Sequence, residues 1–116
     1  MAIQNDPLQI KQGADYVYGF NVSDGAGNPI DLSDGVVTGQ IRAYAGGALY
    51  ATFTATVTDP AMGIGIMSLT AKQTRAIPAT AKIPWKHDAF FLRSDGVTIP
   101  IVGTTDVNVE AAVTTS

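Results

Sequence analysis

Residues 15–29 read DYVYGFNVSDGAGNP, an alternating run of large side chains followed at once by turn-forming residues. The large residues occupy every second position, and alternate residues of an extended chain share one face: Tyr16, Tyr18, Phe20 and Val22. The Asp-Gly and Asn-Pro pairs that follow supply the positive φ and the fixed φ that a chain reversal requires. This stretch predicts a β-strand with one buried face, ended by a turn.

The same alternation recurs along the rest of the chain. Residues 37–44 and 49–57 predict two further strands joined by a hairpin at Gly46-Gly47. In 49–57, β-branched threonines lie on one face and apolar residues on the other. Further strands are expected at 8–10, 64–69, 85–93, 97–102 and 106–110, with Gly103 separating the last two.

One segment departs from this period of two. Residues 70–77 read TAKQTRAI and predict one or two helical turns, with Thr70 as the N-cap and Pro78 as the stop. Seven or eight short strands with regularly spaced turns are typical of an all-β sandwich or small barrel. In the strand at 85–93 we expect His87 and Ala89 on one face, and Asp88, Phe90 and Leu92 on the other.

Composition limits the classes of function. The chain has 116 residues, 46% of them apolar, enough for one core; charged residues are only 15%, where roughly a quarter is usual. A net charge of −3 with scattered Lys and Arg argues against nucleic-acid binding. The absence of cysteine excludes disulfides and thiolate metal sites. We expect no signal peptide and no membrane span.

The search for catalytic and metal sites predicts none. His87 is the only histidine, and its neighbour Asp88 points to the opposite face of a strand, so the two cannot pair directly. Most carboxylates fall in turns, where Asp accepts backbone N–H groups. A calcium loop is the sharper alternative for four residues, although the EF-hand pattern and its closing Glu are missing: Asp24, Asn28, Asp31 and Asp34. We expect no catalytic residue, no metal and no cofactor.

Aromatic residues give the candidate binding positions. Trp85 with Tyr44 and Tyr50 could stack on a sugar, but such residues are more often anchors of a core or of an interface. His87 is expected to be a cross-strand or interface residue. The candidate interface residues are therefore Tyr44, Tyr50, Trp85 and His87.

The order of these motifs resembles small immunoglobulin-like phage and prophage structural domains. Residues 12–35, QGADYVYGFNVSDGAGNPIDLSDG, are similar to the opening of that family, which has a Q-G, an alternating strand and D-x-x-G-x-P-x-D-L-[ST]. The resemblance covers about residues 8–114, and its further motifs follow in order: GQIR at 39–42, GIGIMSL at 63–69, the turn at 70–78, His87-Asp88, and Asp95-Gly96 with Gly103. His87 stands where the family has Tyr, and Pro100 replaces a strand residue.

The resemblance implies an immunoglobulin-like antiparallel β-sandwich, one domain over residues 1–116 with arms at 1–7 and 111–116. It implies a non-enzymatic virion protein of the tail or baseplate, present in many symmetric copies and bound to other virion proteins. Capsid (head) decoration or a neck accessory role is one alternative, and a carbohydrate- or receptor-binding module is another. Synthesis is expected in the host cytoplasm, followed by assembly into the virion.

Overall fold

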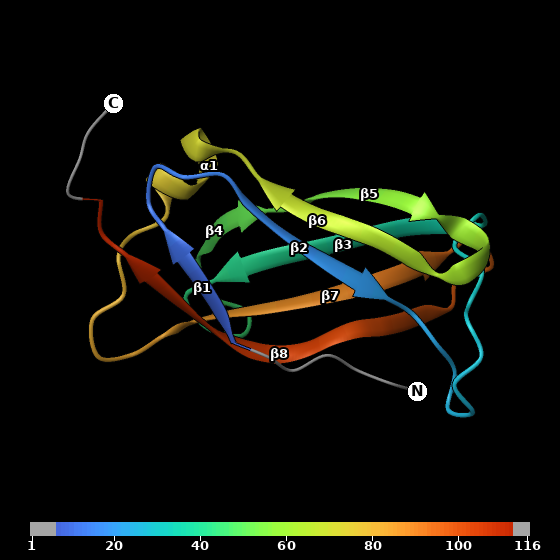
Figure 1. Ribbon diagram of the computed structural model, residues 1–116. Coiled ribbons are helices and arrows are strands. Elements are labelled where there is room, and N and C mark those ends of the chain that lie inside the picture. The colour runs from blue at the N-terminus through green and yellow to red at the C-terminus, as the bar shows by residue number, and fades with distance from the viewer. Residues whose placement is uncertain (1–6, 113–116) are drawn as a thin grey trace.

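The computed structural model describes residues 7–112, which form two β-sheets packed face to face (Figure 1). The strands in chain order are β1 (Leu8–Lys11), β2 (Tyr16–Asn21), β3 (Gly35–Arg42), β4 (Leu49–Thr52), β5 (Thr54–Asp59), β6 (Ile64–Leu69), β7 (Trp85–Arg93) and β8 (Thr98–Glu110). Five strands form one sheet in the order β1-β8-β7-β3-β4, and three form the other in the order β2-β6-β5. The predicted all-β sandwich is confirmed.

The strand order corresponds to an immunoglobulin-like sandwich. Such a fold places strands B, E and D in one sheet and G, F and C, with C′ added in some members, in the other; here β2, β6 and β5 form the first set, and β8, β7, β3 and β4 the second. All strand pairs are antiparallel except β1, which runs parallel to β8 with Leu8 beside Val107. This parallel pair joins the two ends of the described chain.

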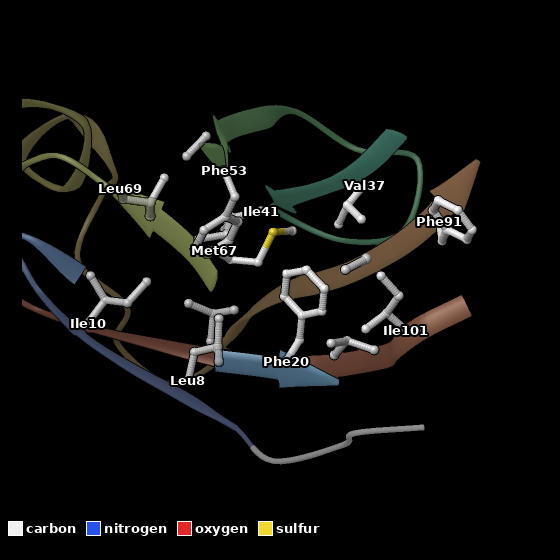
Figure 2. Close-up of a cluster of buried hydrophobic side chains, with 14 of the residues drawn as sticks. Leu8, Ile10, Phe20, Val37, Ile41, Phe53, Met67, Leu69, Phe91 and Ile101 are labelled. Carbon is white, nitrogen blue, oxygen red and sulfur yellow. The ribbon is translucent and has the colours of Figure 1, made fainter. Parts of the chain in front are cut away.

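Alternation places the predicted faces correctly. Tyr18 and Phe20 of β2 lie beside Met67 and Gly65 of β6, and these residues point between the sheets. In β7 the two faces separate as predicted, and the face with His87 and Ala89 is the buried one. The inward rows of both sheets meet in one cluster of buried side chains (Figure 2). The sandwich thus forms because each long strand offers one apolar face.

The strand predicted at 49–57 is in fact two strands in different sheets. β4 pairs with β3, and Phe53 N continues that pairing by donating to Gly39 O at 2.9 Å; β5 then pairs with β6. The chain thus passes from one sheet to the other near Phe53. From Ala51 to Val57 the alternation is unbroken, because the same core lies between the two sheets. Leu49, expected in the same inward row, is instead 47% exposed, because a bulge shifts the β3–β4 register before Ala51.

The predicted interruption at Gly103 is also wrong. β8 runs through it as one strand of 13 residues. The β7–β8 register shifts on either side of Ala89, so that Ala89 pairs with Val102 and His87 with Thr105. These shifts accommodate the break in alternation around Gly103 without ending the strand. Pro100 fits because, among residues 7–112, β8 has a strand partner on only one side at that point, and proline is confined to such edges.

The predicted helical segment is confirmed as α1 (Ala71–Ala76), preceded along the chain by a 3₁₀ turn, η1 (Pro60–Met62). Thr70 and Gln73 form a capping box in which each side chain accepts from the other's backbone N–H. The buried Thr74 hydroxyl ties the helix to the start of β2 by donating to Ala14 O at 2.8 Å. Of the predicted arms, residues 1–6 and 113–116 lie outside the described residues.

Candidate functional site

The single histidine lies in the core and not on a surface. His87 is 1% exposed, and its ring packs against Phe53 and Tyr18 at centroid distances of 4.8 and 5.6 Å. Its Nδ1 lies 3.0 Å from Gln40 O, which can only accept, so Nδ1 carries the proton. Its Nε2 therefore accepts from the Tyr18 hydroxyl at 2.7 Å. Both ring nitrogens are satisfied inside the sandwich.

This arrangement keeps both groups neutral. Burial lowers the pKa of His87, and burial also raises the pKa of Tyr18 well above its usual range. A general base must reach the proton of a substrate or of a nucleophile. The His87 ring is enclosed by aromatic side chains and its Nε2 is occupied by a phenol. The pair therefore serves packing and orientation in the core.

The buried neutral histidine predicts a pH dependence of stability. In the unfolded chain a histidine titrates near pH 6.5, whereas folding lowers the pKa of His87, so the unfolded state binds more protons as the pH falls. We expect the free energy of unfolding to decrease by about 1 kcal/mol between about pH 7 and pH 5.5. Urea titrations at the two pH values measure it.

His87→Gln is the control for this prediction. The variant is expected to be less stable at both pH values, but its free energy of unfolding should not change between them, because it has no histidine. The exposed carboxylates Asp24 and Asp31 have lowered pKa values, so they titrate at more acidic pH. An equal pH dependence in the variant would show that His87 is not the responsible group.

Tyr50 and Trp85, two of the candidate interface residues, contact each other at one end of the sandwich. Their ring centroids are 5.0 Å apart, and both pack against the buried cluster. The Trp85 indole Nε1 donates to Pro78 O at 2.7 Å. Tyr50 lies at a bulge between the β3–β4 pairs Ile41–Ala51 and Arg42–Leu49. The pair thus packs against the core, and the indole N–H of Trp85 is already bonded.

Tyr44, the remaining candidate, lies in the β3–β4 hairpin and is 66% exposed. Its ring lies over Gly47, where an added Cβ would meet ring atoms at 2.9 Å. The structure thus brings Tyr50 and Trp85 together, buries His87 and leaves Tyr44 at the surface. The four residues do not form one site.

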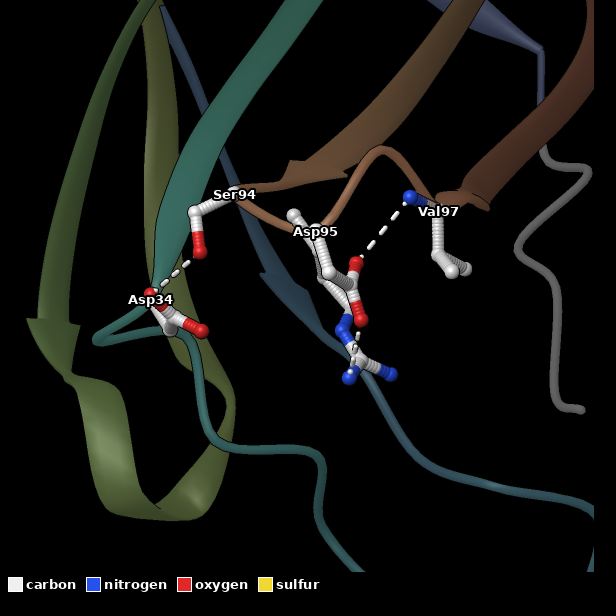
Figure 3. Close-up of polar contacts among 5 residues, drawn as sticks. Asp34, Ser94, Asp95 and Val97 are labelled. Carbon is white, nitrogen blue, oxygen red and sulfur yellow. Dashed lines mark hydrogen bonds and ion pairs between the residues drawn. The ribbon is translucent and has the colours of Figure 1, made fainter.

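The carboxylates considered for calcium each hold a turn. Asp24 accepts from the backbone of Ala26 and Asn28, and Asp31 accepts from the N–H and hydroxyl of Ser33. Asp34 accepts from Ser94, which ties two turns together, and Asp95 pairs with Arg93 and accepts from Val97 N (Figure 3). In residues 7–112 no group of three or more His, Cys, Asp or Glu side chains is placed to hold a metal.

The outer face of the three-stranded sheet is the feature that composition alone did not reveal. We call it the neutral face, and its outward residues form cross-strand rows whose only charge is Asp59, which pairs with Ile64 at one end: Val17, Gly19, Asn21, Thr54, Thr56, Ile64, Ile66 and Ser68. Asp59, at the end of β5, is the only charged residue between Arg42 and Lys72. Val17 is 57% exposed and Ile64 is 40% exposed. This face offers methyl, methylene and hydroxyl groups to a partner.

The opposite face of the sandwich carries the charge. Arg42, Lys86 and Asp106 lie side by side across β3, β7 and β8, with an ion pair between Lys86 and Asp106. The Arg42 guanidinium is held by Gln40 and by Gly47 O. The other ion pairs in the described part of the chain, Lys11–Glu110 and Arg93–Asp95, also involve this five-stranded sheet. The charged side chains of the strands therefore lie mainly on the five-stranded sheet, and the neutral face has few.

Comparison with known proteins identifies no family for this chain. The sequence matches no protein-family model, and no significant match is found among curated proteins. In residues 7–112 no helix is long and apolar enough to cross a membrane.

Proposed function

We propose that this chain is a structural protein of a phage virion, a non-enzymatic assembly or adaptor component of the tail or baseplate. It is present in many symmetric copies and binds other virion proteins through the neutral face. The observation that carries the proposal is the segregation of charge, with Val17, Ile64 and Ile66 exposed or half-exposed on a sheet whose only charged residue is Asp59, at the end of β5. The ordered motifs of residues 12–103 support the same class.

The physics of desolvation favours this use of the neutral face. Burying an ionised side chain without a partner costs several kcal/mol, whereas burying methyl groups is favourable by about 25 cal/mol per Å². The interior of a stable interface is depleted of charge for this reason. The exposed threonines of β5 also give up little side-chain entropy on contact, because β-branched side chains are already restricted. The neutral face therefore suits permanent contact with another subunit.

The contacts of His87 and Trp85 favour a structural binding role over a catalytic or a sugar-binding role. The histidine is enclosed and bonded on both nitrogens. The Trp85 ring is half-buried against Tyr50 and the core, which leaves no open aromatic platform at that pair. A sugar-binding role gains no specific support from these contacts.

The test is incorporation into particles. Phage particles produced in cells that express a tagged copy should contain the chain after purification, and antibody labelling in the electron microscope should place it on the tail or baseplate. Labelling on the head would favour the decoration alternative instead. Purified particles without the chain would contradict the whole proposal.

A matched pair of valines tests the neutral face itself. Val17 on β2 and Val36 on β3 are similarly exposed, at 57% and 64%, but they lie on the outer faces of different sheets. Val17→Lys should reduce the number of copies per particle by roughly tenfold or more, because it buries an unpaired charge in the interface. Val36→Lys should be incorporated like the wild type. Equal incorporation of both variants would exclude the neutral face.

A further inference from the structure

β5 is an edge strand with no partner on its outer side among residues 7–112. It pairs with β6 along one side and is the last strand of its sheet (Figure 1). Such an edge presents a row of unpaired N–H and C=O groups that can bind another strand. Thr54, Thr56 and Thr58 are exposed along it. The edge also borders the neutral face.

The sequence of this edge lacks the usual protection. Natural edge strands are guarded by Lys, by Pro, by bulges or by inward-pointing charges. Residues 43–58 contain no charged residue and no proline. The only protective features of β5 are the register shift between Val57 and Asp59 and the Asp59 carboxylate, both at its end. The centre of the strand, from Thr54 to Val57, is open.

The other edges are less suited to pairing, and the part of β8 that lies beyond β1 contains Pro100, which has no N–H to donate. In β4, a strand of four residues, Thr52 O already accepts from the Gln73 side chain at 3.3 Å, so the segment around α1 occupies the end of that edge. β1 has four residues and carries Lys11. β2 has glycine at position 19, and a glycine weakens a strand because it offers no side chain to a neighbour.

We propose that β5 pairs in antiparallel fashion with β5 of a second copy of this chain, so that the two three-stranded sheets join into one. A register centred on Thr56 places Thr56 opposite itself, Thr54 opposite Thr58, and Ala55 opposite Val57. Self-pairing sets like side chains against like, which is unfavourable for charges and favourable for threonines. An uncharged centre on a chain of net charge −3 fits a second copy. This association goes beyond the proposed function, because it belongs to the isolated chain.

The test is a charge exchange at the centre of the strand. The wild-type chain should show a concentration-dependent shift from monomer to dimer in sedimentation between roughly 10 and 500 μM, the range of small interfaces. Thr56→Lys and Thr56→Glu should each raise the dissociation constant by roughly tenfold or more, because equal charges meet at the two-fold axis. An equimolar mixture of the two variants should restore the dimer.

The matched control is Thr98→Lys, an exposed threonine on β8 in the other sheet. It should dimerise like the wild type, and circular dichroism should show that all variants keep their β-structure. In the wild type, amide exchange in residues 54–58 should slow as the concentration rises. A monomeric wild type, a mixture that stays monomeric, or dissociation by Thr98→Lys would overturn the proposal. None of these outcomes depends on incorporation into particles, which tests the proposed function separately.

Discussion

Replacing Gly63 by alanine is expected to lower the free energy of unfolding by about 3–4 kcal/mol. Gly63 has φ +69°, and a Cβ there would lie 2.5 Å from Val22 O and 2.8 Å from Ile30 O. Both atoms belong to backbone carbonyls, which cannot rotate away as a flexible side chain could. The variant must either shift two backbone segments or abandon the turn before β6.

Gly27→Ala separates the crowding from the backbone conformation. Gly27 has φ +86°, but nothing lies within 4 Å of the position of its added Cβ. It should cost only about 1 kcal/mol, the penalty of a left-handed conformation for alanine. Urea unfolding followed by the fluorescence of Trp85, the single tryptophan, measures both variants. Equal losses in the two would show that the carbonyl contacts at Gly63 carry no cost.

Gly63 matters because it links the turn-rich segment after β2 to the sheet with the neutral face. Val22 N donates to Gly63 O at 2.8 Å, and Leu32 N donates to Pro60 O at 2.9 Å. These bonds fix the segment that follows β2 against the entry to β6, the central strand of that sheet. Loss of the turn is therefore expected to disturb the support of the neutral face as well as stability.

Periodicity was sufficient to predict most strands and their buried faces. The rows from Tyr16 to Phe20 and from His87 to Phe91 follow from alternation alone, since a strand with one apolar face must turn it to a core. The helix at α1 was equally readable, because Thr70 and Pro78 mark its limits. These features depend on residues that are close in sequence, so the local residue pattern is enough to predict them.

Pairing between distant segments could not be predicted in the same way. The crossing near Phe53 leaves no mark in the alternation, because both sheets face one core. The continuity of β8 through Gly103 depends on bulges opposite Ala89, which only the register with β7 defines. The parallel pairing of β1 with β8 joins residues 99 positions apart, such as Leu8 and Val107. Periodicity predicts which residues of a strand share a face, but it does not predict which other strand the strand pairs with.

The contacts of the candidate site residues could not be predicted from local sequence patterns either. The Tyr18–His87 hydrogen bond joins residues 69 positions apart, so no local sequence pattern predicts it. The low overall charge of 15% was visible, but its concentration on the five-stranded sheet required the assignment of each strand to a sheet. Once β5 and β6 are placed together with β2, the sequence in which Asp59 is the only charged residue becomes a surface with one charge at its end.

Replacing Phe91 by alanine is expected to lower the free energy of unfolding by about 3–5 kcal/mol, the cost of an emptied aromatic site in a packed core. Phe91 is fully buried, between Val37 of β3 and Ile99 of β8. Its ring also lies close to Gly35, where an added Cβ would meet a ring atom at 2.7 Å. The truncation therefore removes closely packed contacts to β3 and β8 and leaves a cavity in the core.

The neighbouring Phe90 supplies the matched control for this last prediction. It has the same side chain on the same strand, but it points outward, beside Thr38 and Pro100, and is only partly buried. Phe90→Ala should cost about 1 kcal/mol. Urea unfolding of the two variants compares the faces of β7 directly. Similar losses would mean that both faces of β7 are covered in solution, which would require a second layer of protein over the five-stranded sheet.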